Sequence, residues 1–74
     1  DTVVSNPPIR AGKKVIYAMF QESYDHLSAN GTLIAVVRRT QGAESAQKYI
    51  AEVFGNCDVI SRDRGYWVLK GVRI

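Results

Sequence analysis

Thr32-Leu33-Ile34-Ala35-Val36-Val37 is a short run that is continuously apolar after its first residue and partly β-branched. A run of this kind is typical of a strand covered on both faces, as in a parallel sheet. Arg38 and Arg39 follow directly and mark the exit of the strand into solvent. We therefore expect a buried strand over Thr32–Val37 and an α/β fold built around it.

Amphipathic helices are predicted on both sides of this strand. From Lys13 to Leu27 the apolar side chains recur at steps of three and four residues, and Asn30-Gly31 follows as a left-handed stop. The segment Ala43–Phe54 repeats the pattern and is closed by Gly55-Asn56. The periodic apolar positions are Ile16, Met19, Phe20 and Leu27 in the first segment, and Ala46, Tyr49, Ile50, Val53 and Phe54 in the second.

Further strands are expected at both ends of the chain. Asp1–Ser5 is a β-branched run stopped by prolines, which favours a buried strand. Cys57–Ser61 and Tyr66–Val72 are strand-like and joined by Arg62-Asp63-Arg64-Gly65, which suits a tight hairpin. The order strand-helix-strand-helix-strand-strand implies right-handed crossovers and a mostly parallel sheet with one reversed strand. One face of this sheet is left under-covered, and Asp1–Ser5 forms an open apolar edge.

The composition limits what the chain can be. Its 74 residues suffice for one small domain, and 46% hydrophobic against 23% charged residues excludes a disordered tail. No apolar run approaches the roughly 20 residues of a membrane span. A single cysteine, Cys57, permits no internal disulfide, and a single histidine, His26, leaves a metal site short of ligands. We expect a cytoplasmic location, no membrane, no metal, and, from the net charge of +3, a polyanionic partner.

A candidate site lies at the end of the first expected strand. Ligands of open α/β sheets bind beyond the carboxyl ends of the strands, where Asn6-Pro7-Pro8 and the loop Arg38–Gly42 are expected. The Asn6 amide oxygen and the next backbone carbonyl can both accept hydrogen bonds from one planar amine, and proline has no N–H to compete. Such a clamp orients the amine toward an electrophile. The alternative is an Asx-type turn in which Asn6 caps its own backbone.

Several motifs together resemble a known family. They are Val3-Val4-Ser5-Asn6-Pro7-Pro8-Ile9-Arg10-Ala11-Gly12-Lys13, Asn30-Gly31-Thr32-Leu33, Phe54-Gly55-Asn56 and Tyr66-Trp67-Val68-Leu69. Over nearly its whole length the chain resembles the carboxyl-terminal half of a class I S-adenosylmethionine-dependent methyltransferase. It is similar to the small-domain family that includes the ribosomal RNA small-subunit guanine methyltransferase C. The resemblance implies a Rossmann-like sheet with an antiparallel last strand, residues 1–74 forming one partial catalytic domain, and an exocyclic base amine as the target.

The resemblance also assigns roles to residues. Asn6 and the Pro7 carbonyl would hold the amine against the cofactor methyl, and Pro8 would shape the pocket wall. Ile9 departs from the pattern, since many amino-methylating relatives have an aromatic residue there that stacks on the base. The assignments are Asn6, Pro7 and Pro8 as catalytic, Asn6 also as cofactor-binding, and Ile9, Arg10, Gly12, Lys13, Arg38 and Gln41 as substrate-binding. For Lys13 and the two arginines Arg38 and Arg39, a solvated surface position is the alternative.

The main cofactor motif of such enzymes has no counterpart in these residues. Neither a glycine-rich turn after a first strand nor the acidic residue that holds the ribose can be placed in the sequence. We therefore expect upstream strands in the intact protein, and inactivity of the isolated 74 residues, without measurable S-adenosylmethionine binding. The expected partner is RNA, in particular ribosomal RNA, and self-association through the open strand Asp1–Ser5 is the alternative pairing.

Other classes of nucleic-acid-binding or nucleotide-binding protein match the sequence less well. The loop Ile9–Lys14 faintly resembles the backbone-clamping loop of KH domains, but Val15 stands where a second glycine is needed. A phosphate-binding loop is excluded because Lys14 replaces the Ser or Thr that would hold magnesium. A small stand-alone nucleic-acid-binding or assembly module without catalysis stays open. The aromatic side chains are interpreted as packing groups, namely Tyr17, Tyr24, Tyr49, Tyr66 and Trp67.

Overall fold

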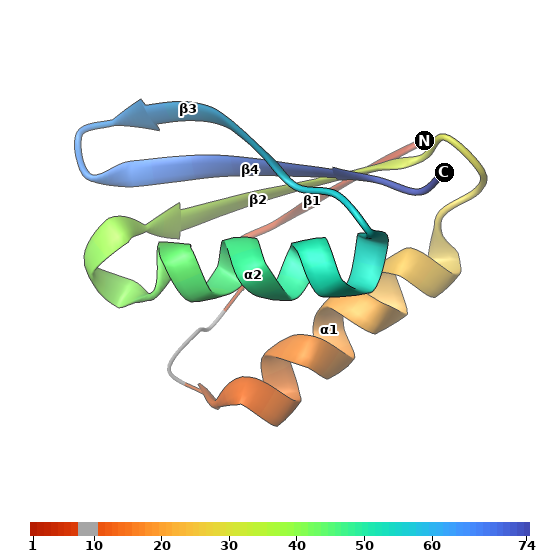
Figure 1. Cartoon of the computed structure of the whole chain (residues 1–74), viewed down its shortest axis with the longest axis horizontal. Helices are drawn as coiled ribbons and strands as arrows, with labels where there is room; N and C mark the ends of the chain where they lie inside the picture. The colour runs from red at the N-terminus through yellow and green to blue at the C-terminus, as the bar shows by residue number, and fades with distance from the viewer. Residues whose placement is uncertain (8–10) are drawn as a thin grey trace.

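The computed structural model describes residues 1–7 and 11–74 and confirms the expected order of elements. Both helices cover the same face of a four-stranded sheet, which gives the molecule two layers (Figure 1). The elements are β1 (Thr2–Ser5), α1 (Lys13–His26), β2 (Thr32–Arg38), the short 3₁₀ helix η2 (Arg39–Gln41), α2 (Ala43–Phe54), β3 (Asp58–Asp63) and β4 (Tyr66–Val72).

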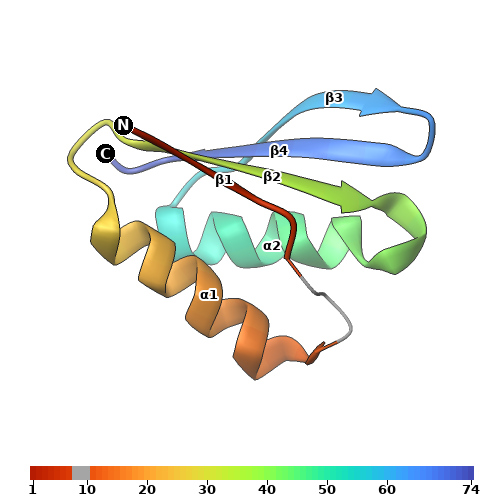
Figure 2. The ribbon, with the colours of Figure 1, turned by 180° about the vertical axis from the view of Figure 1, so that it is seen from behind.

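The strands lie in the order β1-β2-β4-β3. β1 and β2 are parallel, while β4 is antiparallel to both of its neighbours, so β4 alone runs against the other three strands. This confirms the prediction of one reversed strand. Because β4 lies between β2 and β3, the sheet contains a single parallel pair (Figure 2).

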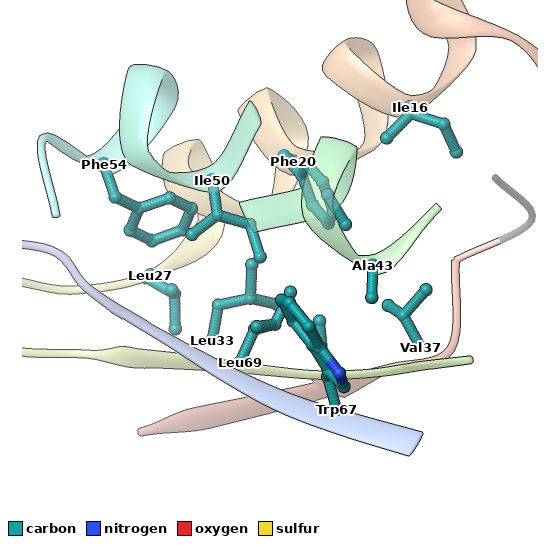
Figure 3. Close-up of a cluster of buried hydrophobic side chains, with 12 residues drawn as sticks. Ile16, Phe20, Leu27, Leu33, Val37, Ala43, Ile50, Phe54, Trp67 and Leu69 are labelled. Atoms are coloured by element: carbon teal, nitrogen blue, oxygen red, sulfur yellow. The ribbon is translucent and has the colours of Figure 1, made fainter. Parts of the chain in front are cut away.

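The core lies between the helices and one face of the sheet (Figure 3). Alternate residues of the two central strands point into it, as the period of two in a strand requires. The helices contribute side chains at steps of three, four and seven residues, which keeps them on one helix face. The buried residues include Leu33, Ala35 and Val37 of β2, Trp67 and Leu69 of β4, Ile16 and Phe20 of α1, and Ala43, Ala46, Ile50 and Phe54 of α2.

The opposite face of the sheet differs from what the apolar runs predicted. Val4 of β1 is 72% exposed, and Ile34 and Val36 of β2 are only half-buried. The prediction that Thr32–Val37 is covered on both faces is therefore wrong, and so is the prediction that Asp1–Ser5 is a buried strand. The reason is that both crossovers place their helices on the same side, which leaves one face under-covered, as the order of elements indicated (Figure 1).

Two side chains fix the end of β4. Asn56 Nδ2 donates to the carbonyl of Val72 at 2.8 Å, and the Val72 N–H donates to Asn56 Oδ1 at 3.0 Å, so one carboxamide replaces a strand residue beside β4. Arg73 donates to the carbonyls of Tyr24 and Leu27 at the carboxyl end of α1. A cation there suits the negative end of the helix dipole.

The β3–β4 hairpin turns through two residues. Arg64 has a φ of 52° and Gly65 a φ of 81°, which is the pattern of a type I′ turn. The predicted hairpin is thus confirmed, although Arg62 and Asp63 belong to β3 rather than to the turn. A positive φ is unusual for arginine, since it costs roughly 1 kcal/mol relative to residues that tolerate this region.

Candidate functional site at the carboxyl edge of the sheet

The carboxyl ends of β1 and β2 lie at the same edge of the sheet because the two strands are parallel (Figure 2). Asn6 follows β1 directly and is exposed, whereas Pro7 is buried. Proline restricts the backbone at this position and leaves its carbonyl without a competing N–H. Two oxygen acceptors, the Asn6 side chain and the Pro7 carbonyl, therefore stand next to each other in the chain at the edge where ligands of α/β sheets bind.

The loop that follows is described only in part. The assignments for Pro8, Ile9 and Arg10 lie outside the described residues. Gly12 is the residue before α1 and has a φ of 105°, a backbone conformation that favours glycine. Lys13 begins α1, and its Nζ lies 5.5 Å from the centre of the Tyr17 ring. Its side chain is thus placed against its own helix.

A second loop reaches the same edge from β2. Ser5 pairs with Ala35, and β2 continues to Arg38, so this strand extends three residues further than β1. Arg38 Nε donates a hydrogen bond of 2.8 Å to the hydroxyl oxygen of Tyr66. Gln41, the last residue of η2, is exposed. The structure therefore brings Arg38 and Gln41 to the edge that carries Asn6.

A hollow of about 720 Å³ opens between this second loop and the β3–β4 turn. We call it the arginine groove and define it by Arg38, Arg39, Arg62, Arg64, Asp63 and Tyr66, which lie among the residues that line it. Four arginines against one aspartate leave a formal charge of +3 in this one place. Figure 1 shows the β3–β4 turn beyond the arrowhead of β2, at the end where the chain enters α2.

The sequence did not single out Arg62, Arg64 or Tyr66 as site residues. Tyr66 was interpreted as a packing group, but it is 38% exposed, so that interpretation is wrong for this residue. It holds for Trp67, which is 9% exposed, for Tyr24, whose ring meets Phe54 edge-on, and for Tyr49, which is half-buried against the core beside Tyr17. The sequence Arg62-Asp63-Arg64-Gly65 could have indicated these site residues. Because β3 runs parallel to β2, the turn after β3 lies at the same edge of the sheet as the loop after β2.

Two other side chains that could take part in chemistry, those of Cys57 and His26, lie outside the arginine groove. Burial and, to a smaller extent, the Asp58 carboxylate raise the pKa of the Cys57 thiol from 9.0 to about 11. The thiol is therefore protonated at neutral pH and is a poor nucleophile. His26 is exposed in the last turn of α1, with Nδ1 2.8 Å from the carbonyl oxygen of Glu22.

Within residues 1–7 and 11–74, no three His, Cys, Asp or Glu side chains come together in a way that could hold a metal ion. No helix in the described part of the chain has both the length and the apolar character needed to cross a membrane.

The architecture defines the class of protein. Parallel β1 and β2, the inserted antiparallel β4 and the outer β3 match the carboxyl-terminal part of a methyltransferase fold. The family model of the methyltransferase small domain matches residues 1–70, and the chain belongs to this family. The resemblance inferred from the sequence is thereby confirmed.

Similar proteins extend this result. The chain is 41% identical over 73 residues to the uncharacterized protein YbxB of Bacillus subtilis, covering 99% of this chain and 36% of that protein. It is 24% identical over 78 residues to the ribosomal RNA large subunit methyltransferase G of Psychromonas ingrahamii, covering 20% of it. The solved structure of the 16S rRNA N2 G1207 methyltransferase (RsmC) of T. thermophilus, in complex with AdoMet and guanosine, superposes with a TM-score of 0.87 at 23% identity.

The matched region is only part of each relative. The chain spans about a third of the length of the Bacillus protein and a fifth of the other two, while nearly all of the chain is covered each time. The likeness to the solved structure concerns the fold, and at that level it is close.

Proposed function

We propose that this chain is the carboxyl-terminal half of the catalytic domain of an S-adenosylmethionine-dependent methyltransferase. The proposed substrate is an exocyclic base amine of RNA, in particular guanine in ribosomal RNA. The observation that carries the proposal is the position of Asn6-Pro7, which directly follows β1 at the carboxyl edge of a sheet with methyltransferase topology. The names of two relatives, which are ribosomal RNA methyltransferases, support RNA as the substrate.

Asn6 and Pro7 are assigned the role of positioning the substrate amine. The Asn6 side-chain oxygen and the Pro7 carbonyl accept one hydrogen bond each from the two N–H groups of the amine, which directs the nitrogen lone pair away from them. S-adenosylmethionine, when bound, supplies an electrophilic methyl carbon on that side. Holding a nucleophile in line in this way lowers the barrier mainly through orientation. Pro8 is assigned to the pocket wall, and Ile9, Arg10, Gly12, Lys13, Arg38 and Gln41 to contacts with the RNA.

The cofactor is assigned mostly to parts of the protein outside this chain. Of the residues present, only Asn6 is given a contact with S-adenosylmethionine, because it would stand next to the transferred methyl group. The isolated 74 residues are then inactive, and the intact protein acts in the cytoplasm on RNA. The open edge of β1 pairs with upstream strands in this proposal, and self-association through that edge is the alternative.

The experiment compares two exposed asparagines in the intact protein. Asn6→Ala removes one of the two acceptors, whereas Asn30→Gly removes an exposed carboxamide at the opposite end of β2, where a φ of 68° suits glycine. Methyl transfer from labelled S-adenosylmethionine to ribosomal RNA is measured, and the modified nucleoside is identified by mass spectrometry. We expect Asn6→Ala to lower kcat/KM about 10²- to 10³-fold, as for loss of one preorganised polar contact, and Asn30→Gly to leave it unchanged.

The same experiment distinguishes methyl transfer from the alternative function. A non-catalytic RNA-binding or assembly module would give no methylated nucleoside with either protein. A methyl group on a ribose or on a ring carbon would contradict the assignment of an amine clamp to Asn6-Pro7.

A further inference from the structure

Four of the six arginines in the chain line one hollow, the arginine groove. Their formal charge, net of Asp63, is +3, which equals the net charge of the whole chain. A groove with one sign of charge concentrates ions of the opposite sign. The guanidinium group is the side chain best suited to phosphate, since its fork of donors matches two phosphate oxygens.

Two of the four arginines are held in place by aromatic rings. Arg38 donates to the Tyr66 hydroxyl at 2.8 Å, and its guanidinium carbon lies 5.2 Å from the centre of that ring. The guanidinium carbon of Arg62 lies 4.5 Å from the centre of the Trp67 ring. Such contacts reduce the side-chain freedom that would be lost on binding a ligand.

The two walls of the groove are joined through the backbone. The N–H of Arg39 donates to the carbonyl of Gly65 at 2.8 Å, which ties the loop after β2 to the β3–β4 turn. This hydrogen bond holds the two walls of the groove together. Arg64 is carried at the tip of the turn at a φ of 52°, a position that Asn or Gly would occupy with less strain. The unfavourable residue at this position points to a role outside folding.

The groove lies close to the proposed catalytic edge but does not coincide with it. Arg38 stands three residues beyond Ala35, the partner of Ser5, which is an offset of roughly 10 Å along the strand direction at about 3.3 Å per residue, and the β3–β4 turn lies beyond β2 on the side away from β1, at about 4.8 Å per strand. Offsets of this size correspond to a few stacked nucleotides at roughly 3.4 Å each. A strand whose target base is at Asn6 would thus bring phosphates of neighbouring nucleotides to the groove.

We propose that the arginine groove binds the phosphate backbone of the RNA strand next to the target nucleotide, and that Arg39 and Arg64 supply two of its phosphate contacts. The exposed ring of Tyr66 offers a surface on which a neighbouring base stacks. This inference rests on the proposed function for the identity of the strand. Contacts of this kind position the substrate without reading its sequence.

The test measures RNA affinity separately from methyl transfer. The intact protein is titrated against a fluorescein-labelled single-stranded RNA of mixed sequence, and anisotropy is followed over a range of salt concentrations. The variants are Arg39→Ala, Arg64→Asn and their combination. Arg64→Asn places an Asn-Gly pair in a turn that prefers it, so loss of folding does not explain a loss of affinity. Lys48→Ala removes an exposed charge from α2, outside the groove, as the control.

The expected changes follow from counterion release. For single strands the logarithm of the affinity falls with the logarithm of the salt concentration by about 0.7 per phosphate contact. Each lost contact should weaken binding about fivefold at 0.1 M salt, and the double variant about 25-fold, with a salt slope smaller by about 1.4. In methyl transfer we expect KM to rise while kcat is kept. Lys48→Ala should change neither the slope nor KM.

The outcomes distinguish this inference from the function on which it rests. An unchanged salt slope in the double variant overturns the groove as a phosphate site, even if methyl transfer by the unmodified protein is found. Conversely, a reduced slope in a protein that transfers no methyl group supports the groove and removes the proposed catalytic function. A double variant that loses kcat at an unchanged RNA affinity also overturns the inference.

Discussion

Replacing Asn56 tests how the end of β4 is held in the sheet. β3 begins at Asp58, which pairs with Lys70, so the β3 ladder does not reach Val72. The carboxamide of Asn56 takes the place of the missing strand residue, with hydrogen bonds of 2.8 and 3.0 Å to Val72 and one of 3.2 Å to the carbonyl of Phe54. Asn56→Ala removes all three at once.

The expected loss follows from the number of these bonds and their exposure. A hydrogen bond contributes about 1 kcal/mol net, so three would contribute about 3 kcal/mol. Because Asn56 is only half-buried, water replaces part of what is lost, and we expect Asn56→Ala to lower the free energy of unfolding by about 2 kcal/mol. If the opening is local to this strand, the Val72 amide should exchange about 30-fold faster with solvent.

A charge variant sharpens the test. Asn56→Asp keeps the acceptor for the Val72 N–H but turns both donors into a carboxylate that faces two carbonyl oxygens. At neutral pH we expect it to be at least as destabilising as Asn56→Ala. The two carbonyl oxygens raise the pKa of the new carboxyl above the ordinary aspartate value. As the pH falls through that range one donor returns, and the Asp variant should become the more stable of the two.

The assay is urea denaturation of the intact protein combined with hydrogen exchange of peptides from β4. Unchanged m values would show that the native and unfolded states are comparable between variants. Free energies of unfolding within about 0.5 kcal/mol of the unmodified protein for both variants would refute the role of Asn56 as a substitute strand residue. The same role would be refuted if one of the two variants had the higher free energy of unfolding at both neutral and acidic pH.

The remaining predictions concern a thiol and the cofactor. Because the folded state raises the pKa of Cys57 to about 11, the unfolded state binds fewer protons above pH 9, and stability should fall between pH 9 and pH 11. From about pH 8 to about pH 10 we expect the free energy of unfolding to fall by about 1 kcal/mol, a value already reduced for the partial exposure of the thiol to water. Cys57→Ala should lack this fall, and parallel curves of stability against pH for the two proteins would contradict the prediction. Calorimetry of the isolated 74 residues with S-adenosylmethionine should show no binding, and a tight complex would overturn the assignment of the cofactor site to the rest of the protein.

Local sequence pattern predicted the individual elements closely. The helix expected over Ala43–Phe54 has these bounds in the structure, and so does the strand Tyr66–Val72. The first helix ends at His26, one residue earlier than expected, and β2 continues through Arg38. These elements could be predicted because helix and strand periodicity, glycine stops and β-branched runs act over a few neighbouring residues.

The candidate site was predictable only in the part that is local. Asn6 and Pro7 were placed at the sheet edge because they follow a strand directly, and their roles are still proposals. The arginine groove escaped prediction because its walls are far apart in the chain, with Arg38 and Tyr66 separated by 28 residues. No local pattern indicates that two such loops meet.

The sequence by itself determined which segments form helices and strands, which edge of the sheet carries Asn6, and which family the chain resembles. Only the tertiary structure decided that β4 enters between β2 and β3 and that four arginines share one groove. The physical reason is that element formation depends on short-range backbone and side-chain preferences. Strand order and loop contacts depend instead on which distant surfaces bury each other when the chain closes on itself.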